Sequence, residues 1–173
     1  QPWLKWDEFH AVMNYPLSES IKDYFLRQRK KTEQFISEIN SQSMYYKQQI
    51  SEVMFNLLDS HDTERILTTA KGNIQHVKAA LTFLYLQKGT PCIYYGTELA
   101  LIGGPDPDCR RVMPWDRVSE DNDMLNFMKK LIKIRKDVAR IIQHGNYRLE
   151  EVKPDVLALI WNYQGKEVQA IFN

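Results

Sequence analysis

The sequence is poor in cysteine, because only Cys92 and Cys109 occur among its 173 residues. Two cysteines cannot form the several bridges that stabilise small secreted domains, and neither belongs to a CxxC pair or to a His and Cys cluster with zinc spacing. The composition therefore argues against a disulfide scaffold and against a structural zinc site. It favours a reduced, cytoplasmic setting, in which the two thiols are either free or joined to each other.

The sequence also lacks an excess of charge of one sign and a long apolar run. Lys and Arg number 23 against 22 Asp and Glu, which gives a net charge of +1. Such a balance offers no electrostatic footprint for nucleic acid or for an acidic membrane. No stretch approaches the about 18 apolar residues of a spanning helix, and no signal peptide is visible. We therefore expect no nucleic-acid partner and no membrane partner. Because the chain starts at Gln1, we also expect it to be a piece of a longer protein.

What the sequence does contain is an alternation of apolar runs and amphipathic stretches. Strand-like runs cover 9–17, 53–58 and 90–98, and helical patterns cover 18–40, 72–88 and 122–142, with Ser18 as a cap and Gly89 as a stop. Strands and helices in this order are typical of parallel β/α units. After Gly145 only strand-like runs remain, at 147–152, 156–163 and 168–173, which predicts the opening of a separate antiparallel domain.

Each predicted parallel strand ends in polar or aromatic residues, which are Asn14 and Tyr15, then His61 and Asp62, then Tyr95, Gly96 and Glu98. In β/α barrels this end of the strands carries the active site, because the βα loops converge there. A His-Asp pair at that point can meet a polyhydroxylated or charged ligand. A plainer interpretation is also open, in which the pair is a hydrogen-bonded turn capped by Asp59 and Glu64 with Arg65 is a surface ion pair.

Three segments carry a resemblance to a known family: MNYPL, NLLDSHDTERI and PCIYYGTELALIGGPDPDCRRVMPWD, in this order. Together they resemble the alpha-amylase family of glycoside hydrolases, and within it the branch of neopullulanases, cyclomaltodextrinases and maltogenic amylases. The HD pair after an apolar strand is similar to the fourth signature region of the family, and the YYG-x-E and GG-x-DP-x-CR segments follow at matching spacing. The resemblance extends essentially from end to end of the chain.

The resemblance implies an α/β fold that is incomplete. Residues 1–144 would be the C-terminal part of a catalytic (β/α)8 TIM barrel, with strands six to eight and their helices. Residues 145–173 would begin the antiparallel β-sandwich domain that follows the barrel. Such a part of a barrel has unpaired strand edges and uncovered inner faces. The missing N-terminal half of the barrel is therefore an expected partner, and self-association is expected without it.

The resemblance also implies a retaining hydrolase of α-1,4 bonds, with α-1,6 bonds as a further option, in maltodextrins, cyclodextrins or pullulan. The nucleophile and the general acid of the family, an Asp and a Glu, would lie upstream of Gln1. Glu8, Glu19 and Asp23 are not placed to replace them, so the isolated chain is expected to be inactive. The alternative is a non-catalytic piece that binds α-glucan oligosaccharides or assembles with another chain.

Asp62 is the catalytic residue that the resemblance assigns to this chain, as the carboxylate that stabilises the transition state by accepting hydrogen bonds from the 2- and 3-hydroxyls of the sugar. His61 would donate to the same hydroxyls. Asp106 and Arg110 would bind a neighbouring glucose unit, with an ion-paired brace of their loop as the open alternative. Asn14 and Tyr15 would line the cleft, unless MNYP has a structural role. Arg65 and Glu98 are interpreted as structural residues.

A metal site is not predicted in this segment. Asp106, Asp108 and Asp116 do not follow an EF-hand pattern. We therefore expect no cofactor here, whereas calcium stays an option for the parent protein.

Overall fold

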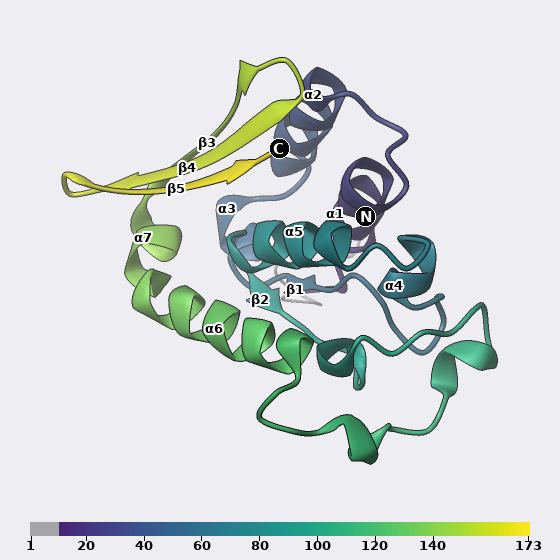
Figure 1. The fold of residues 1–173 in the computed structure, drawn as a ribbon. Helices are drawn as coiled ribbons and strands as arrows, with labels where there is room; N and C mark the ends of the chain where they lie inside the picture. The colour runs from purple at the N-terminus through teal and green to yellow at the C-terminus, as the bar shows by residue number, and fades with distance from the viewer. Residues whose placement is uncertain (1–10) are drawn as a thin grey trace.

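The computed structural model describes residues 11–173, and Figure 1 shows their arrangement. The helical elements are α1 (Tyr15–Ile21), the π-helical turn η1 (Lys22–Leu26), α2 (Thr32–Ser43), α3 (Gln48–Ser51), α4 (Ile66–Thr69), α5 (Ile74–Tyr85), the 3₁₀ turns η2 (Thr97–Leu99), η3 (Asp108–Arg110) and η4 (Trp115–Arg117), α6 (Asp123–Asp137) and α7 (Ala139–His144). The strands are β1 (Phe55–Asn56), β2 (Thr90–Pro91), β3 (Asn146–Lys153), β4 (Val156–Tyr163) and β5 (Lys166–Phe172).

The three predicted parallel strands lie side by side, but only short parts of them have strand geometry. Strands β1 and β2 are parallel, and Met13 forms a parallel bridge to Phe55 on the other side of β1. The buried Asn56 side chain joins all three segments, since its amide nitrogen donates to the carbonyl oxygen of Lys88 at 2.6 Å and its oxygen accepts from the amide of Asn14 at 3.0 Å. The predicted order of parallel β/α units is therefore confirmed over Met13, β1 and β2, whereas residues 9 and 10 of the first run lie outside the described residues.

The predicted helix over 18–40 is two helices, and its predicted cap is wrong. Asn14 rather than Ser18 caps α1, because the Asn14 side chain accepts a hydrogen bond from the N–H of Leu17. Ser18 is buried inside the helix instead. The chain breaks between η1 and α2, where Gln28 has a φ of 52°. A positive φ is uncommon for residues other than glycine. The amphipathic pattern alone therefore does not reveal the break.

The two later helical patterns are confirmed more closely. Asn73 caps α5 by accepting from the N–H groups of Gln75 and His76. Gly89 follows this helix with a φ of +92°, and a Cβ atom there would lie 2.6 Å from the carbonyl oxygen of Met54. Only glycine fits such a position. The helix itself ends earlier, at Tyr85 with Leu86 as its C-cap, so the predicted stop at Gly89 lies three residues too late. The pattern over 122–142 is divided into α6 and α7 at Val138.

The C-terminal residues form an antiparallel sheet with the order β3-β4-β5, as predicted for three strand-like runs. Figure 1 shows this sheet at the upper left, next to α2 and above α7. The ring centroid of Phe172 lies 5.2 Å from that of Phe25 and 5.9 Å from that of Phe83. The indole N–H of Trp161 donates to the carbonyl oxygen of Leu86. The buried residues of the sheet thus share one core with the helices. A domain boundary at 144/145 stays a prediction.

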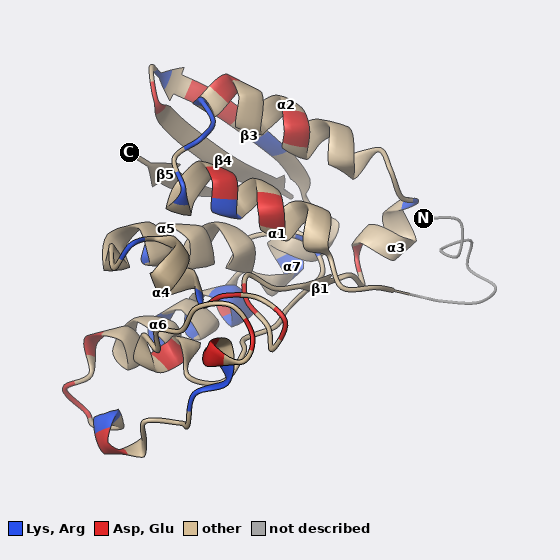
Figure 2. Ribbon diagram, turned by 90° about the vertical axis from the view of Figure 1, so that its right-hand side faces the viewer, with Lys and Arg blue, Asp and Glu red and all other residues tan. Residues whose placement is uncertain are grey.

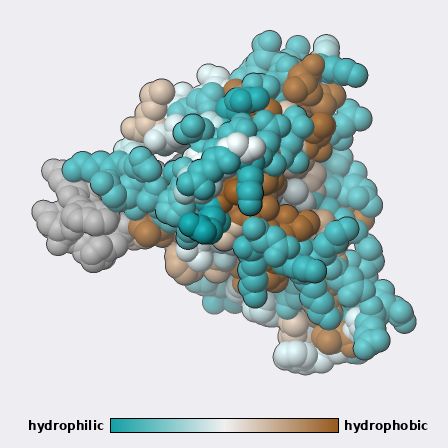
Figure 3. All heavy atoms as spheres, turned by 90° about the vertical axis from the view of Figure 1, so that its left-hand side faces the viewer, coloured by the Kyte–Doolittle hydropathy of each residue, from teal (hydrophilic) through white to brown (hydrophobic). Residues whose placement is uncertain are grey.

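The surface of the molecule mixes polar and apolar side chains. In Figure 3 apolar residues gather near the centre of the face, with hydrophilic residues on both sides. In Figure 2 acidic and basic residues are interspersed along the helices and loops. Within residues 11–173, no helix is both long enough and apolar enough to cross a lipid bilayer.

Candidate functional site

The turn after β1 presents two ionisable side chains to solvent. The N–H of Ser60 donates to the Thr63 hydroxyl at 2.9 Å, and the N–H of Asp62 donates to the Ser60 hydroxyl at 3.2 Å. These short polar side chains bond to nearby backbone and so fix a tight turn. His61 and Asp62 keep 58% and 61% of their side chains exposed and lie 3.3 Å apart. The plainer interpretation of a hydrogen-bonded turn is therefore correct for the backbone, while the side chains are left free to meet a ligand.

The loop before η3 brings a second ion pair against this turn. Arg110 Nε lies 2.6 Å from Asp106 Oδ1, and an Nη atom of Arg110 lies 3.7 Å from Asp62 Oδ1. The structure thus gathers four of the six predicted site residues, His61, Asp62, Asp106 and Arg110, into one exposed cluster, which we call the HD cluster. Asp106 and Arg110 do form the ion-paired brace, and the same arginine faces Asp62. In Figure 2 acidic and basic parts of these loops lie near one another below α4.

Asn14 and Tyr15 lie at the start of α1 and face different surroundings. The Asn14 side chain bonds to Asn56 and lines a cavity together with Gln42 and Met54. Tyr15 is 37% exposed, on the same side of the chain as Met13, whose sulfur its hydroxyl approaches at 4.0 Å. No contact between either residue and the HD cluster is found among the described residues, and their role in a cleft stays a prediction.

Arg65 supports the HD cluster from beneath. Its side chain is fully buried, Nε donates to the carbonyl oxygen of Cys109 at 2.7 Å, and Nη1 donates to that of Tyr95 at 2.5 Å. The guanidinium also lies over the rings of Tyr94 and Tyr95, at 4.0 and 4.7 Å from their centroids. The interpretation of Glu64 and Arg65 as a surface ion pair is therefore wrong. A guanidinium provides planar donors and a face for stacking at once, which explains why arginine occupies this place.

Asp59 holds the turn to the third strand segment. Its carboxylate accepts from the Thr97 hydroxyl at 2.9 and 3.1 Å, and from the N–H of Ile66 at 3.4 Å. The predicted cap of the His-Asp turn is therefore not found, because the N–H groups of that turn donate to Thr63 and Ser60, and Asp59 instead binds the N–H of Ile66 at the start of α4. Burial raises the pKa of the Asp59 carboxyl, although the hydrogen bonds from Thr97 and Ile66 and the charges of Arg65 and Lys22 oppose this shift.

The loop that carries Arg110 is fixed by its own polar contacts. Asp108 accepts from Arg111 at 2.8 and 2.9 Å and from the N–H of Gly104 at 2.6 Å, and these bonds hold the pKa of Asp108 below its usual value. The buried Cys109 thiol donates to the carbonyl oxygen of His61 at 3.1 Å, so it links the loop directly to the HD turn. Both cysteines are free, which settles the question that composition left open.

Sequence reasoning did not assign Thr97 or Cys109 to the site. A threonine inside YYGTE and a cysteine between charged residues carry no signal of their own. The available signal was indirect, since both lie in the segments that follow the third strand, and parallel strands end at one edge of a sheet.

The HD cluster combines an exposed carboxylate, an imidazole and a guanidinium with an acidic partner. Carboxylates accept hydrogen bonds, imidazole and guanidinium nitrogens donate them, and a pair of vicinal hydroxyls needs both. The arrangement therefore suits a neutral polyhydroxylated ligand. Two carboxylates, Asp62 and Asp106, face one guanidinium, so the cluster has no excess of positive charge and does not favour a phosphate or a free carboxylate.

Comparison with known proteins agrees with the family resemblance of the sequence. Residues 1–142 match the family described as alpha amylase, catalytic domain. The chain is 41% identical to the intracellular maltogenic amylase of Bacillus subtilis over all of its length and 30% of that protein, and 36% identical to neopullulanase 2 of Thermoactinomyces vulgaris over 99% and 29%. A solved cyclomaltodextrinase superposes with a TM-score of 0.92 at 38% identity, over 99% of this chain and 30% of that structure.

The chain belongs to the alpha-amylase family of glycoside hydrolases, since the family match covers most of its residues. It resembles the maltogenic amylase, cyclomaltodextrinase and neopullulanase members, as the sequence predicted. The chain spans about 30% of the length of the curated relatives that it matches.

The central place of Arg65 predicts a large cost for replacing it. Arg65→Lys keeps the positive charge but cannot donate to two carbonyl groups while stacking on a tyrosine. We expect the free energy of unfolding to fall by about 3 kcal/mol, the scale of two hydrogen bonds to a charged group. Urea unfolding measures this change. Arg117→Lys, on the exposed turn η4, is the matched control and should stay within about 0.5 kcal/mol of the parent chain. Equal stabilities of the two variants would contradict the assignment.

The raised pKa of Asp59 predicts a distinct pH dependence. When pH falls, the folded chain takes up a proton at Asp59 before the unfolded chain does, so stability rises relative to Asp59→Asn. This gain begins at the folded pKa and is complete below the usual carboxyl value of 3.8. Asp108→Asn should behave oppositely, because the lowered pKa of Asp108 contributes stability that is lost in acid. Urea unfolding across this pH range measures both differences, and differences of the same sign would contradict the prediction.

Proposed function

We propose that the chain forms one side of the active site of an α-glucan hydrolase. In this proposal residues 1–144 are strands six to eight of a (β/α)8 barrel with their helices, and residues 145–173 begin a β-sandwich domain. The observation that carries it is the HD cluster, where two separate βα loops place Asp62 within 3.7 Å of Arg110 at an exposed strand end. The substrates proposed are maltodextrins, cyclodextrins or pullulan, in keeping with the names of the relatives.

Asp62 has the role of the carboxylate that binds the sugar rather than attacking it. Its oxygens would accept from the 2- and 3-hydroxyls of the sugar at the cleavage point, and His61 would donate to the same groups. Such hydrogen bonds strengthen as positive charge develops on the sugar ring. Arg110, held by Asp106, would donate to an adjoining glucose unit and orient Asp62.

The retaining reaction needs two further carboxyl groups, about 5–5.5 Å apart. Glu19 and Asp23 are unsuited to this work, because both lie on α1 and η1 in ion pairs with Arg27, at 2.9 and 2.8 Å. Glu8 lies outside the described residues. We therefore propose that the nucleophile and the general acid come from another part of the protein, and that the 173 residues alone do not hydrolyse glucans.

We assign no cofactor to this segment. Asp106 and Asp108 are engaged by Arg110 and Arg111, which makes them poor calcium ligands. Calcium elsewhere in the larger protein is compatible with this proposal. A cytoplasmic location is proposed from the two free cysteines and from the printed name of the intracellular relative.

Catalysis can be tested with Asp62→Asn in the protein that includes the rest of the barrel. The amide keeps the shape but loses the charge, and we expect kcat on maltotriose to fall about a thousandfold, with a smaller change in KM. Initial rates on maltotriose, β-cyclodextrin and pullulan measure this effect. Asp116→Asn, in the exposed turn η4 of the same connection, is the control and should keep its rate. An unchanged rate of the Asp62→Asn protein would contradict the role assigned to Asp62. Turnover by the 173 residues alone would contradict the proposal that the nucleophile lies in another part of the protein.

The barrel proposal also predicts a partner for one face of the parallel strands. Along β1, Asn56 is buried, whereas the neighbouring Phe55 is 46% exposed. Met13 and Tyr15, in the adjacent segment, are also exposed but to a smaller extent. Alternate residues of a strand point to opposite faces, so these side chains share the face that the interior of a barrel would cover. We propose that the missing N-terminal half of the barrel covers it, and that the chain alone self-associates there.

Phe55→Glu tests this face. We expect the 173-residue chain to form dimers or larger species at micromolar concentrations, and the glutamate to shift it towards monomer. Light scattering after size exclusion measures the mass. Val112→Glu changes an even more exposed apolar residue in a distant loop and should leave the mass unchanged. A monodisperse monomer of the unaltered chain would overturn the proposal.

A further inference from the structure

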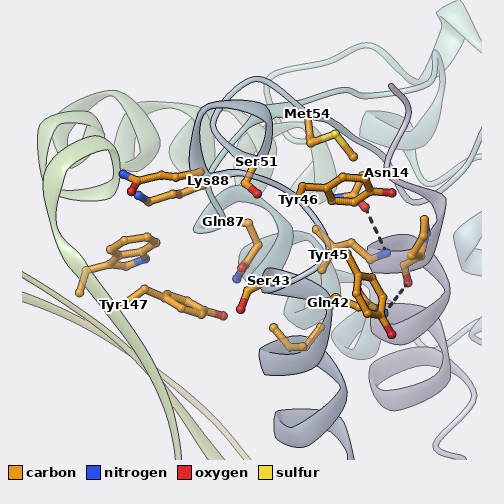
Figure 4. Close-up of a pocket in the computed structure, with 15 residues that line it drawn as sticks. Asn14, Gln42, Ser43, Tyr45, Tyr46, Ser51, Met54, Gln87, Lys88 and Tyr147 are labelled. Carbon is orange, nitrogen blue, oxygen red and sulfur yellow. Dashed lines mark hydrogen bonds between the residues drawn. The ribbon is translucent and has the colours of Figure 1, made fainter. Parts of the chain in front are cut away.

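The cavity that Asn14 lines together with Gln42 and Met54 lies between the helices and the C-terminal sheet and includes no residue of the HD cluster (Figure 4). It has a volume of about 350 Å³. Tyr147 of β3 and Trp161 of β4 line it from the sheet, Gln42 lines it from α2, and Gln87 lines it from the residues after α5. Small-molecule sites are commonly concave spaces of about 300–1,000 Å³ between packed units, so this cavity suits a small ligand.

The cavity holds a polar group that has no partner within the described structure. The Tyr147 hydroxyl is buried and lacks a hydrogen bond to any described residue. In Figure 4 the hydroxyl end of its ring points towards the side where Gln87 and Ser43 lie. Burial raises the pKa of Tyr147, and the nearby Gln87 side chain opposes this shift without completing a hydrogen bond of normal geometry, so the hydroxyl is a neutral donor. Buried hydroxyls are nearly always paired, so this one marks a place where a ligand or a water molecule is bound.

Two amides in the lining offer acceptors on the same side. Gln42 donates its N–H groups to Ser20 Oγ at 2.8 Å and to the carbonyl oxygen of Pro16 at 3.3 Å. Gln87 donates to the carbonyl oxygen of Phe83 at 3.2 Å. Because these nitrogens donate to other groups, the side-chain oxygens remain as acceptors, and the Gln87 side chain lies next to the Tyr147 hydroxyl.

The rest of the lining is apolar or aromatic and carries little charge. Tyr46, Met54 and Trp161 contribute apolar surface, and the indole N–H of Trp161 is already used by the carbonyl oxygen of Leu86. Lys88 is the charged residue among those that line the cavity, and its ammonium lies 3.4 Å from Glu52. A charged ligand would therefore find no free counter-charge here.

We propose that this cavity is a binding site for one neutral pyranose unit. A pyranose has an apolar face of C–H groups that packs on aromatic rings, and a rim of hydroxyls that both donate and accept hydrogen bonds. One hydroxyl would accept from Tyr147, and others would donate to the Gln42 and Gln87 oxygens. The volume suits a single sugar ring, which is either free glucose or the end of a maltodextrin. The inference rests on the lining and does not require the HD cluster to be catalytic.

The test is a titration of the isotope-labelled 173-residue chain with glucose, followed by two-dimensional NMR. We expect the amide signals of Gln42, Gln87 and Tyr147 to move. Tyr147→Phe should weaken glucose binding about three- to tenfold, the effect of one hydrogen bond between neutral groups. Its own stability should be unchanged or higher, because no partner of the hydroxyl is lost, so the variant can be assayed folded. A second titration with maltotriose distinguishes the two forms of the ligand. Tighter binding of maltotriose than of glucose identifies the end of a maltodextrin, and weaker binding identifies free glucose.

Two matched variants separate this site from the HD cluster. Tyr163→Phe removes a hydroxyl from β4 outside the cavity, and Asp62→Asn alters the proposed catalytic site. Both should bind glucose at the cavity as the unaltered chain does. Signal changes confined to residues around His61 and Arg110, equal affinity of the Tyr147→Phe chain, or no change at all would overturn the proposal. The last outcome would mean that water alone satisfies Tyr147.

Discussion

The contacts of one buried cation, Arg65, hold the candidate site together. A guanidinium remains charged in proteins, so burying it requires that its donors be used and its face be covered. Here the carbonyl oxygens of Cys109 and Tyr95 accept from Nε and Nη1, and the rings of Tyr94 and Tyr95 cover the face, whereas the buried Nη2 has no hydrogen-bond partner among the described residues. All of these groups come from the segments after β2. The HD turn before Arg65 and the loop around Arg110 are consequently held in a fixed relation, although both run over the surface.

Asp59 reinforces the same relation from the other side of the turn. Its hydrogen bonds from Thr97 and from the N–H of Ile66 tie the end of β1 to η2 and to the start of α4. The cost of burying a carboxyl group is met by local donors rather than by a direct ion pair. Exposed residues such as Asp62 and His61 are then free of structural duties. A rigid buried layer beneath exposed polar side chains suits the proposed sugar site, because the donors and acceptors of such a site must be oriented before the ligand arrives.

Much of this arrangement could be predicted from the sequence, and the exceptions have physical causes. The helical periodicity of residues 74–85 and the alternation in β3, β4 and β5 were sufficient to locate those elements, since burial on one face determines both patterns. The cap of α1 was misplaced because Asn14 and Ser18 both have side chains that can cap, and only the chain direction after β/α pairing selects between them. The break before α2 depends on the unusual φ of Gln28, which no periodicity records. His61 and Asp62 were predicted from their place after a strand, whereas Asp106 and Arg110 were predicted from the family resemblance alone. Arg65 had a structural interpretation beside that of a surface ion pair, but the sequence did not reveal the tertiary partners that bury it.

The C-terminal sheet links the two ends of the molecule through the same core. Phe172 packs on Phe25 and Phe83, and the latter lies on α5, the helix that connects α4 to β2. The cavity beside Tyr147 is therefore bounded by elements that also set the distance between β1 and β2. A ligand that bridges β3 to Gln42 and Gln87 would stiffen this junction without touching Asp62. Coupling between the cavity and the HD cluster would require a ligand that binds two arrangements of the sheet with different affinities. The aromatic core that the sheet shares with the helices leaves little room for a second arrangement. The cavity is thus better suited to holding a sugar than to switching the HD cluster.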